Sequence, residues 1–228
     1  MKNDEPLIAD RIPTGISGLD KMIQGGLVKG TATLVSGGTG TGKTIFCCQF
    51  IWEGLMRGEN CLFITFEESP EDIITDVRNF GWDFEDYIKK KKLFLEYHDP
   101  FQVTNITSLL VEKIKQNNIS RVAIDSTSIL GLYFKDPSEV RKQLYKLLMA
   151  LKGSGVTTIL TAEIPEDSKK LSRYGVEEFV ADGVIVLHYV GIGENTFNSI
   201  QVRKMRKTNH DKNIYSFDFT DRGLVVRK

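Results

Sequence analysis

The stretch Gly37-Gly38-Thr39-Gly40-Thr41-Gly42-Lys43-Thr44 separates an apolar run at residues 32–35 from a helix-length stretch at residues 45–52. It matches the pattern G-x-x-x-x-G-K-[ST], whose glycines let backbone N–H groups face phosphate oxygens. In that pattern the lysine, here Lys43, reaches the terminal phosphates, and the hydroxyl residue, here Thr44, holds magnesium. A flexible glycine turn is the plainer interpretation, but the whole pattern between a predicted strand and a predicted helix is specific. The stretch therefore predicts a strand, a nucleotide-binding loop and a helix.

A second apolar run, residues 121–125, ends in the carboxylate of Asp125. Ligands gather at the carboxyl ends of the strands of a parallel sheet, so we expect Asp125 to support magnesium or its water shell. Alone it could equally be a surface aspartate that ends a buried strand. The phosphate-binding pattern earlier in the chain favours the metal role.

Two adjacent carboxylates, Glu67 and Glu68, follow a third strand-like run at residues 61–66. This is where a water must be aligned for in-line attack on a γ-phosphate, so one of the two is expected to be the general base. The alternative is that both favour the N-terminus of a helix that begins at Pro70, where acidic residues complement the helix dipole. The pattern alone leaves both interpretations open.

Short apolar runs alternate with amphipathic stretches of helical length over most of the chain. Such alternation predicts an α/β fold with a mostly parallel twisted sheet covered by helices on both faces. Predicted strands also include residues 93–96 and 157–162, and predicted helices are at residues 70–80, 105–117 and 137–152. From Gly183 onward, strand-like runs at residues 184–190, 200–204 and 215–219 follow one another across short turns, which predicts a C-terminal antiparallel extension. We expect one domain over residues 1–228.

The composition limits the classes of function. The chain has 30 Lys and Arg and 30 Asp and Glu, so no global basic field would hold nucleic acid or an anionic membrane. No signal peptide or run of about 20 apolar residues is present, which predicts a cytoplasmic protein without a membrane partner. Cys47, Cys48 and Cys61 lie in apolar stretches and are expected to be reduced core thiols, and the three histidines are too isolated for a zinc site.

Residues 63–82, FITFEESPEDIITDVRNFGW, resemble the segment that follows the phosphate-binding loop in the KaiC family of cyanobacterial circadian-clock ATPases. Residues 12–20, IPTGISGLD, with Gly25-Gly26-Leu27 after them, resemble the entry segment of KaiC and RadA-type RecA-like cores. The resemblance runs to about Asp221. It implies a RecA-like P-loop fold that hydrolyses ATP to ADP and phosphate with Mg²⁺, with Glu67 as the catalytic base and Glu68 beside it.

The same resemblance implies a homo-oligomeric ring, expected to be a hexamer, in which each nucleotide lies between two subunits. A K-x-R-x-T-x-H segment of one subunit then reaches the nucleotide of its neighbour. The matching positions in this chain are Lys204, Arg206, Thr208 and His210, with Asp221 further on. Charge alone favours a solvated hairpin tip instead. Lys207 stands where relatives commonly carry glycine, so the geometry and charge of this turn are expected to differ.

One unit of KaiC phosphorylates itself on adjacent serine and threonine residues, and the other is mainly an ATPase. Residues 174–182 resemble the ATPase unit, because Glu178 and Phe179 occupy the positions of the phosphorylated pair and offer no such hydroxyl group. Autophosphorylation of that type is therefore not expected.

Loops that face the channel of RecA-like rings can grip single-stranded DNA, and residues 165–175 match such a loop. Lys169, Lys170 and Arg173 would contact the DNA, with Tyr174 as a nearby stacking aromatic. The neighbouring acidic residues favour a charged surface loop instead. The densest basic run, residues 89–92, is predicted to be a solvated helix end.

Three biological roles remain open at this point. The first is a RadA-paralogue-type DNA-repair factor that acts on single-stranded DNA or on a recombinase. The second is a KaiC-like regulatory ATPase that docks protein partners according to its nucleotide state. The third is a nucleotide-binding scaffold with negligible hydrolysis, against which the complete set of Lys43, Thr44, Asp125 and Glu67 argues.

Overall fold

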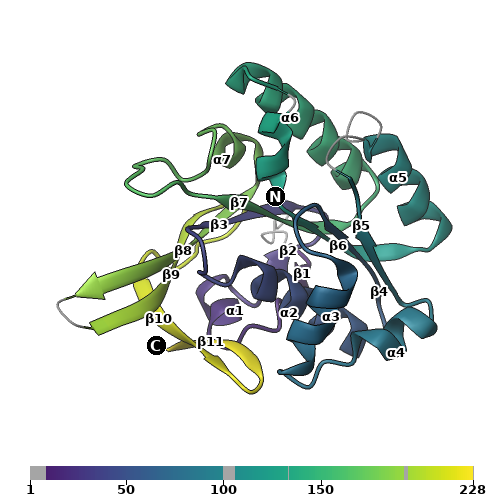
Figure 1. Cartoon of the computed structure of the whole chain (residues 1–228), viewed down its shortest axis with the longest axis horizontal. Helices are drawn as coiled ribbons and strands as arrows, with labels where there is room; N and C mark the ends of the chain where they lie inside the picture. The colour runs from purple at the N-terminus through teal and green to yellow at the C-terminus, as the bar shows by residue number, and fades with distance from the viewer. Residues whose placement is uncertain (1–8, 100–105, 133, 193–194, 228) are drawn as a thin grey trace, which may run out of the picture.

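The computed structural model describes residues 9–99, 106–132, 134–192 and 195–227. Its centre is a nine-stranded sheet in the order β11-β10-β9-β8-β3-β7-β6-β4-β5 (Figure 1). The six strands from β8 to β5 in that order run parallel, and β9, β10 and β11 continue the sheet antiparallel. The predicted fold class is confirmed: an α/β fold with a mostly parallel sheet and antiparallel C-terminal strands.

The inner parallel strands β3, β4, β6 and β7 are buried on both faces over almost their whole length, as their continuous apolar runs predict, whereas the edge strand β5 is only part-buried. The strands of the main sheet are β3 (Ala32–Gly37), β4 (Asn60–Thr65), β5 (Leu93–Tyr97), β6 (Ile119–Asp125), β7 (Thr157–Glu163), β8 (Gly183–Ile192), β9 (Asn195–Met205), β10 (Ile214–Thr220) and β11 (Gly223–Arg227). A separate two-stranded ladder joins β1 (Arg11–Ile12) to β2 (Leu27–Val28). The strands β1, β2 and β11 were absent from the sequence-based prediction, because runs of two to five residues at the ends of the chain give little periodic signal.

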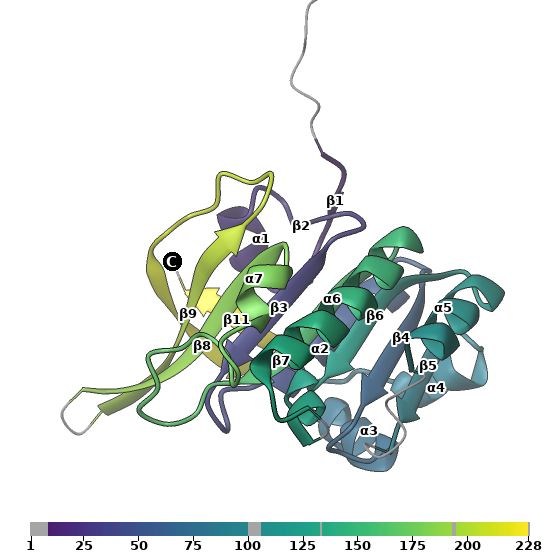
Figure 2. The same ribbon diagram turned by 90° about the horizontal axis from the view of Figure 1, so that it is seen from above.

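Helices cover the two faces of the sheet separately (Figures 1 and 2). One face carries α1 (Leu19–Met22), α2 (Lys43–Met56), α3 (Pro70–Arg78) and α4 (Phe84–Lys89), and the other carries α5 (Ile106–Gln116), α6 (Pro137–Gly153) and α7 (Glu177–Val180). Each layer has its own apolar core. The 3₁₀-helix η2 (Thr127–Leu132) follows β6 directly.

Local sequence signals explain where several helices begin and end. Ser69 caps α3 by accepting a hydrogen bond from the backbone N–H of Asp72, and Pro70 occupies the first turn. The helix ends at Arg78, two residues before the predicted end, because the chain turns at Gly81, where φ is 73°. The basic run that begins at Lys89 is the end of α4, as predicted.

The strand β8 joins the two parts of the sheet. It runs parallel to β3 on one side and antiparallel to β9 on the other. The prediction had placed residues 184–190 wholly in the antiparallel extension, whereas β8 is the last parallel strand. The carboxyl ends of β3, β7, β6 and β4 therefore meet at one edge of the sheet.

Candidate functional site

The loop between β3 and α2 is held in a conformation that only glycine tolerates. Gly40 and Gly42 have φ values of 72° and 88°, in the left-handed region that side chains disfavour. A Cβ atom on Gly37 would lie 2.5 Å from Thr41 Oγ1, and one on Gly42 would lie 2.2 Å from Phe219 Cζ. The glycine pattern is therefore demanded both by the backbone and by close neighbours.

The side chains that follow this loop meet the end of β6. Thr44 Oγ1 donates a hydrogen bond of 2.7 Å to Asp125 Oδ2, and Thr161 Oγ1 donates another to Asp125 Oδ1. Lys43 Nζ donates a bond of 2.8 Å to the carbonyl oxygen of Gly38. Hydroxyl and carboxylate oxygens are the protein donors that Mg²⁺ prefers, usually with one or two carboxylates beside substrate phosphates. The donors present at this edge therefore fit the predicted ion.

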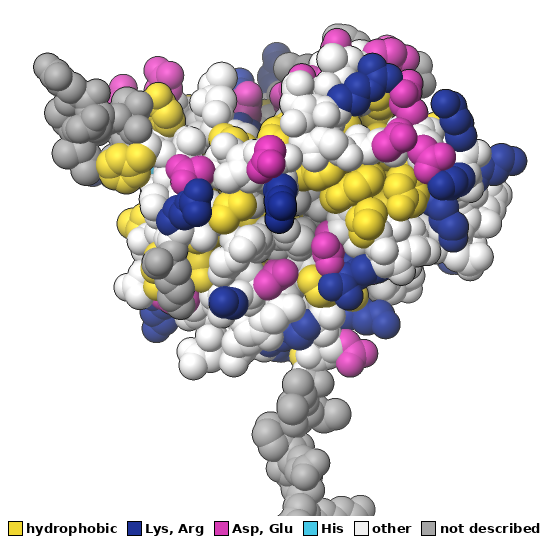
Figure 3. Space-filling view, turned by 90° about the horizontal axis from the view of Figure 1, so that it is seen from below, with side chains coloured by type: hydrophobic (Ala, Val, Ile, Leu, Met, Phe, Trp, Pro, Cys, Tyr) yellow, Lys and Arg dark blue, Asp and Glu magenta, His cyan; other side chains and the backbone are white. Residues whose placement is uncertain are grey.

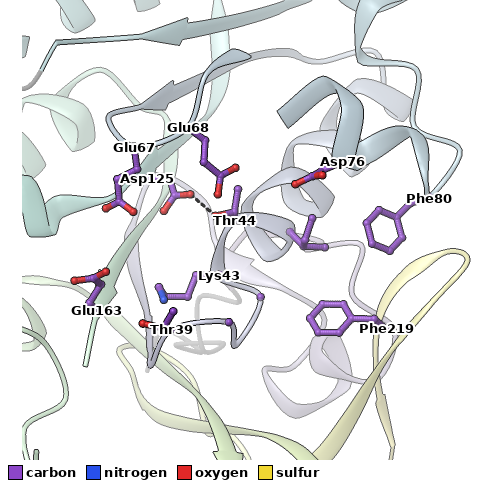
Figure 4. A pocket seen from close by; sticks show the side chains of 13 residues that line it. Thr39, Lys43, Thr44, Glu67, Glu68, Asp76, Phe80, Asp125, Glu163 and Phe219 are labelled. Atoms are coloured by element: carbon purple, nitrogen blue, oxygen red, sulfur yellow. Dashed lines mark hydrogen bonds between the residues drawn. The ribbon is translucent and has the colours of Figure 1, made fainter. Parts of the chain in front are cut away.

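Glu67 and Glu68 both line the same pocket, directly after β4 (Figure 4). Thr65 Oγ1 accepts bonds from both of their backbone N–H groups and orders the turn. Ser126 Oγ donates a hydrogen bond to Glu67 Oε1. Glu68 Oε2 is buried and has no hydrogen-bond partner among the residues that the structure describes.

The electrostatics of the pocket call for a cation. Partial desolvation raises the pKa of the Glu67 carboxyl group, with nearby Asp125 and Glu163 adding to the effect. Desolvation also raises the pKa of Glu68, followed by the charge of Asp125. Five carboxylates and one lysine line the pocket. The negative charges of a nucleotide polyphosphate would be repelled by these carboxylates unless a metal ion accompanied the nucleotide.

The pocket has a volume of about 440 Å³. At the end away from Glu67, the rings of Phe80 and Phe219 lie on the two sides of its mouth, with Asp76 beside Phe80 (Figure 4). The sequence prediction missed these three residues. Phe80 lies in the quoted segment at residues 63–82, and Phe219 precedes Asp221 by two residues, but no motif marks either ring. The full lining comprises Thr39, Gly40, Gly42, Lys43, Thr44, Ile45, Glu67, Glu68, Asp76, Phe80, Asp125, Glu163 and Phe219.

Comparisons with known proteins agree with this geometry. Residues 12–228 match the family described as "ATPase: KaiC". The chain belongs to the KaiC family. It is 37% identical to the circadian clock oscillator protein KaiC of Synechococcus elongatus over 235 residues, covering 98% of this chain and 45% of that protein. It is 35% identical to the circadian clock protein KaiC3 of Synechocystis, again over 45% of its length.

The chain thus spans less than half the length of these curated KaiC relatives. A solved structure of a KaiC-like protein from Pyrococcus horikoshii OT3 covers 96% of this chain and is itself covered completely, with a TM-score of 0.89 and 41% identity. The resemblance to KaiC, and with it a KaiC-like RecA-type P-loop domain, is confirmed.

The residues of the KaiC-type K-x-R-x-T-x-H segment do not line the pocket of their own chain. Lys204 Nζ donates to the carbonyl oxygens of Glu178 and Ala181, at 3.0 and 2.7 Å. Arg206 forms an ion pair of 3.2 Å with Asp182, which also pairs with Lys152. Within a single chain the structure keeps this segment apart from Lys43 and Glu67.

The remaining members of the segment are also held by their own chain. Thr208 Oγ1 accepts a hydrogen bond from Arg11, and His210 Nδ1 lies 2.9 Å from the carbonyl oxygen of Asp211. Asp221 is exposed in the turn between β10 and β11, next to the strand that carries Phe219.

The predicted DNA loop is largely engaged with its own chain. Arg173 forms an ion pair with Glu163 at the pocket. Tyr174 Oη donates a bond of 2.7 Å to the carbonyl oxygen of Ser128, and its ring lies against Gly131. The Tyr174 ring is thus packed onto η2 in this structure, and its part as a nearby stacking aromatic stays a prediction. Lys169 and Lys170 are exposed.

The other predictions about reactive side chains concern the core and α7. Cys47, Cys48 and Cys61 are buried free thiols, and burial raises the pKa of Cys61 to about 12. Glu178 accepts a hydrogen bond from Ser172, and Phe179 lies exposed beneath Arg141. Among the described residues, no group of three or more His, Cys, Asp or Glu side chains could hold a metal ion by itself. No helix in the described ranges is long and apolar enough to cross a membrane.

Proposed function

We propose that this chain is a Mg²⁺-dependent ATPase of a homo-oligomeric ring, with a regulatory role in which the bound nucleotide governs the docking of protein partners. The observation that carries the proposal is the meeting of Lys43, Thr44, Asp125 and Glu67 around one pocket. They come from the ends of three strands and serve the two needs of phosphoryl transfer, which are charge stabilisation and alignment of water. The similarity to circadian-clock proteins supports the regulatory part.

In the proposal, different residues at the phosphate end of the pocket bind the phosphates and the metal ion. The backbone N–H groups of the loop and the ammonium of Lys43 bind phosphate oxygens. Thr44 and Asp125 would hold Mg²⁺, which supplies charge neutralisation at the β- and γ-phosphates. Thr161 keeps the Asp125 carboxylate turned toward Thr44 through its own hydrogen bond.

Glu67 is the general base of the proposal. Its raised pKa, caused first by partial desolvation, makes the carboxylate a stronger base than an exposed glutamate. Ser126 holds one carboxylate oxygen by a hydrogen bond, which leaves the other oxygen to align a water molecule. Glu68 adds negative charge beside it and favours metal-bound over free nucleotide.

Phe80 and Phe219 would receive the nucleobase. Both rings lie at the mouth of the pocket, on the side away from Glu67 (Figure 4), and base–aromatic stacking is tolerant of base identity. The choice of ATP over GTP rests on the family relationship, and the whole chain, residues 1–228, is taken as one RecA-like unit.

Lys204 and Arg206 would complete the site of a neighbouring subunit. Neither lines the pocket of its own chain. To serve another copy, Lys204 would exchange its bonds to the carbonyl oxygens of Glu178 and Ala181 for phosphate oxygens, and Arg206 would exchange its ion pair with Asp182. A cation supplied in trans to the transferred phosphoryl group accelerates the reaction by about 10³ to 10⁵ where such residues have been studied. Thr208, His210 and Asp221 would contact the same nucleotide, and the ring is expected to be a hexamer.

The DNA-repair role is the weaker candidate. Arg173 is neutralised by Glu163, and Tyr174 is packed onto η2, which leaves only Lys169 and Lys170 free for phosphate contacts. On the face seen in Figure 3, Lys and Arg side chains are interspersed with Asp and Glu. No broad basic field, of the kind that dominates DNA affinity, is present on that face.

Two measurements on purified protein test the proposal. Phosphate release from ATP should require Mg²⁺, stop with EDTA and be lost in Lys43→Ala; hydrolysis that persists in Lys43→Ala would overturn the ATPase assignment. Fluorescence anisotropy of a labelled single-stranded oligonucleotide at near-physiological salt should show no nucleotide-dependent binding. Salt-sensitive binding that requires ATP, and that Lys169→Glu with Lys170→Glu removes, would favour the DNA-repair role.

A further inference from the structure

The turn that follows β9 adopts a backbone conformation that needs external support. Lys207 has a φ of 57°, in the left-handed region that residues other than glycine, asparagine and aspartate seldom occupy. It lies next to Arg206 and directly before Thr208. Such a conformation persists only where the surrounding contacts determine it.

Those contacts come from the beginning of the chain. In the sheet order, β1 belongs to a separate ladder, yet the Arg11 guanidinium lies across the turn. Its Nη2 donates 3.1 Å to the carbonyl oxygen of Lys207, and its Nη1 donates 2.8 Å to Thr208 Oγ1. The positive-φ residue is thus held at its own carbonyl group and at the next side chain.

The same guanidinium is anchored on its other side. Nη1 also donates to the carbonyl oxygens of Ile23 and Gly26, at 3.0 and 3.2 Å, and Nη2 donates 3.3 Å to Gln24 Oε1. A Cβ atom on Gly26 would lie 2.3 Å from the carbonyl oxygen of Ile12, so β1 and Gly26 are in fixed close approach. Arg11 therefore joins a rigid N-terminal unit to the turn.

Further bonds from the N-terminal unit extend this attachment along the segment. The backbone N–H of Asn209 donates 3.0 Å to Gln24 Oε1, and that of Asp211 donates 2.8 Å to the carbonyl oxygen of Met22. Upstream, Lys204 and Arg206 are held by the end of α7 and by Asp182. The segment at residues 204–211 is thus fixed from two sides, and Arg11 supplies the contacts at the bend.

We propose that Arg11 is the positioning residue that sets the direction in which Lys204 and Arg206 are presented to the nucleotide of a neighbouring subunit. This inference rests on the proposed function in trans of those two residues. Arginine suits the task because its planar group offers donors in several fixed directions at once, whereas a lysine ammonium is a compact point charge. Arg11 itself acts only through the turn.

The test uses subunit mixing, because a residue that serves the neighbouring site can be complemented. Arg11→Ala keeps an intact P-loop but presents a misplaced turn, and Lys43→Ala has the opposite defect. We expect Arg11→Ala alone to lower kcat by about tenfold or more, with KM for ATP changed by less than about twofold. Co-assembled with Lys43→Ala, it should regain turnover well above the sum of the two separate assemblies.

Matched variants separate the inference from the function on which it rests. Arg206→Ala mixed with Lys43→Ala reports on action in trans alone, and Arg227→Ala, which removes an exposed arginine paired with Asp218, should leave turnover unchanged. If Arg206→Ala is complemented and Arg11→Ala is not, the positioning role is wrong. If neither is complemented, the trans arrangement itself is wrong and the role of Arg11 falls with it.

Two milder variants cover the case in which Arg11→Ala does not fold. Arg11→Lys retains the positive charge but loses the planar guanidinium with its several donors. Gln24→Ala removes the Oε1 acceptor shared by Arg11 and Asn209. Both should show a reduced kcat that mixing with Lys43→Ala restores. Wild-type kcat in both variants would contradict the proposal.

Discussion

Thr44 and Asp125 lie 81 residues apart in the chain and are joined by a 2.7 Å hydrogen bond. The bond ties the first turn of α2 to the end of β6. One partner is a hydroxyl group and the other a carboxylate that Thr161 also orients, and the pair is the Mg²⁺ site that we propose.

Asp125→Asn tests that place. Loss of the charge should raise the Mg²⁺ concentration needed for half-maximal ATP hydrolysis by about tenfold or more, as is typical when the surroundings of a metal are altered. A Mg²⁺ titration of phosphate release measures the shift. Asp136→Asn, at the exposed cap of α6, serves as the control, and an unchanged titration in Asp125→Asn would remove this residue from the metal site.

Glu67→Gln should separate binding from turnover. Removing a general base costs about 10² to 10⁴ in rate, while the affinity for ATP should change little, because Gln keeps the size and one oxygen acceptor. Steady-state hydrolysis and equilibrium binding of ATP measure the two effects. Glu68→Gln is the matched control, and equal turnover losses in both variants would contradict a distinct role for Glu67.

The raised pKa of Glu67 also sets the pH dependence. Activity should fall as acid protonates the base, with the limb at a higher pH than an ordinary glutamate would give. The stability of the fold depends on pH in the opposite direction to activity. The group with the raised pKa contributes its full stabilisation below 4.5, the unperturbed pKa, and this stabilisation is lost as the pH rises through the pKa of the folded state. Glu67→Gln should therefore increase Tm at pH 7, with a smaller gain at pH 5; thermal unfolding at the two values checks this.

Phe219→Ala tests the proposed binding position of the nucleobase. Loss of one stacking ring is worth about 1–3 kcal/mol, so calorimetric affinity for ATP should fall by about tenfold, with little change in affinity for inorganic triphosphate. Phe197, equally exposed at 40% on β9 and outside the pocket, is the matched control. Equal losses for ATP and triphosphate would indicate a role in shaping the loop at Gly42 instead.

Lys207→Gly should stabilise the fold by about 0.5–1 kcal/mol, because glycine relieves the left-handed strain by more than it adds to the entropy of the unfolded chain. Urea denaturation measures the change. Lys212→Gly, at an exposed position outside the left-handed region, should instead be neutral or destabilising. A loss of stability in Lys207→Gly would show that the lysine side chain itself supports the turn.

Glu59→Ala should be costly because its partner, Arg121, is completely buried in β6. The two form a bidentate pair at 2.9 Å, and removal of Glu59 leaves a buried charge with two carbonyl oxygens and the face of the Phe50 ring but no anionic partner among the described residues. We expect Glu59→Ala to lower the free energy of unfolding, measured by urea denaturation, by about 2–3 kcal/mol. The control Glu85→Ala, which breaks the exposed pair with Arg78, should lower it by less than about 1 kcal/mol. Equal effects would show that the buried pair has no special weight.

Local patterns predicted the strands β3, β4, β6 and β7, whose continuous apolar runs follow from burial on both faces. They also predicted Ser69 as the cap of α3, because capping depends on neighbours within one turn. Lys43, Thr44, Asp125 and Glu67, which line one pocket, were predicted as site residues for the same reason: each lies in a short motif or at the end of a predicted strand. The residue patterns did not decide which of Glu67 and Glu68 would be the general base, because both follow β4 and only their contacts in the folded chain distinguish them.

The sequence by itself determined the phosphate-binding loop and the alternation of strands and helices, because glycine conformations, caps and apolar periodicity act over a few residues. Only the tertiary structure decided that Ser126 bonds Glu67, that Phe219 closes on Gly42, and that Arg11 supports the turn at Lys207. These contacts join segments that are up to 197 residues apart. They depend on the order of strands in the sheet and on the packing of whole elements, which no local preference encodes.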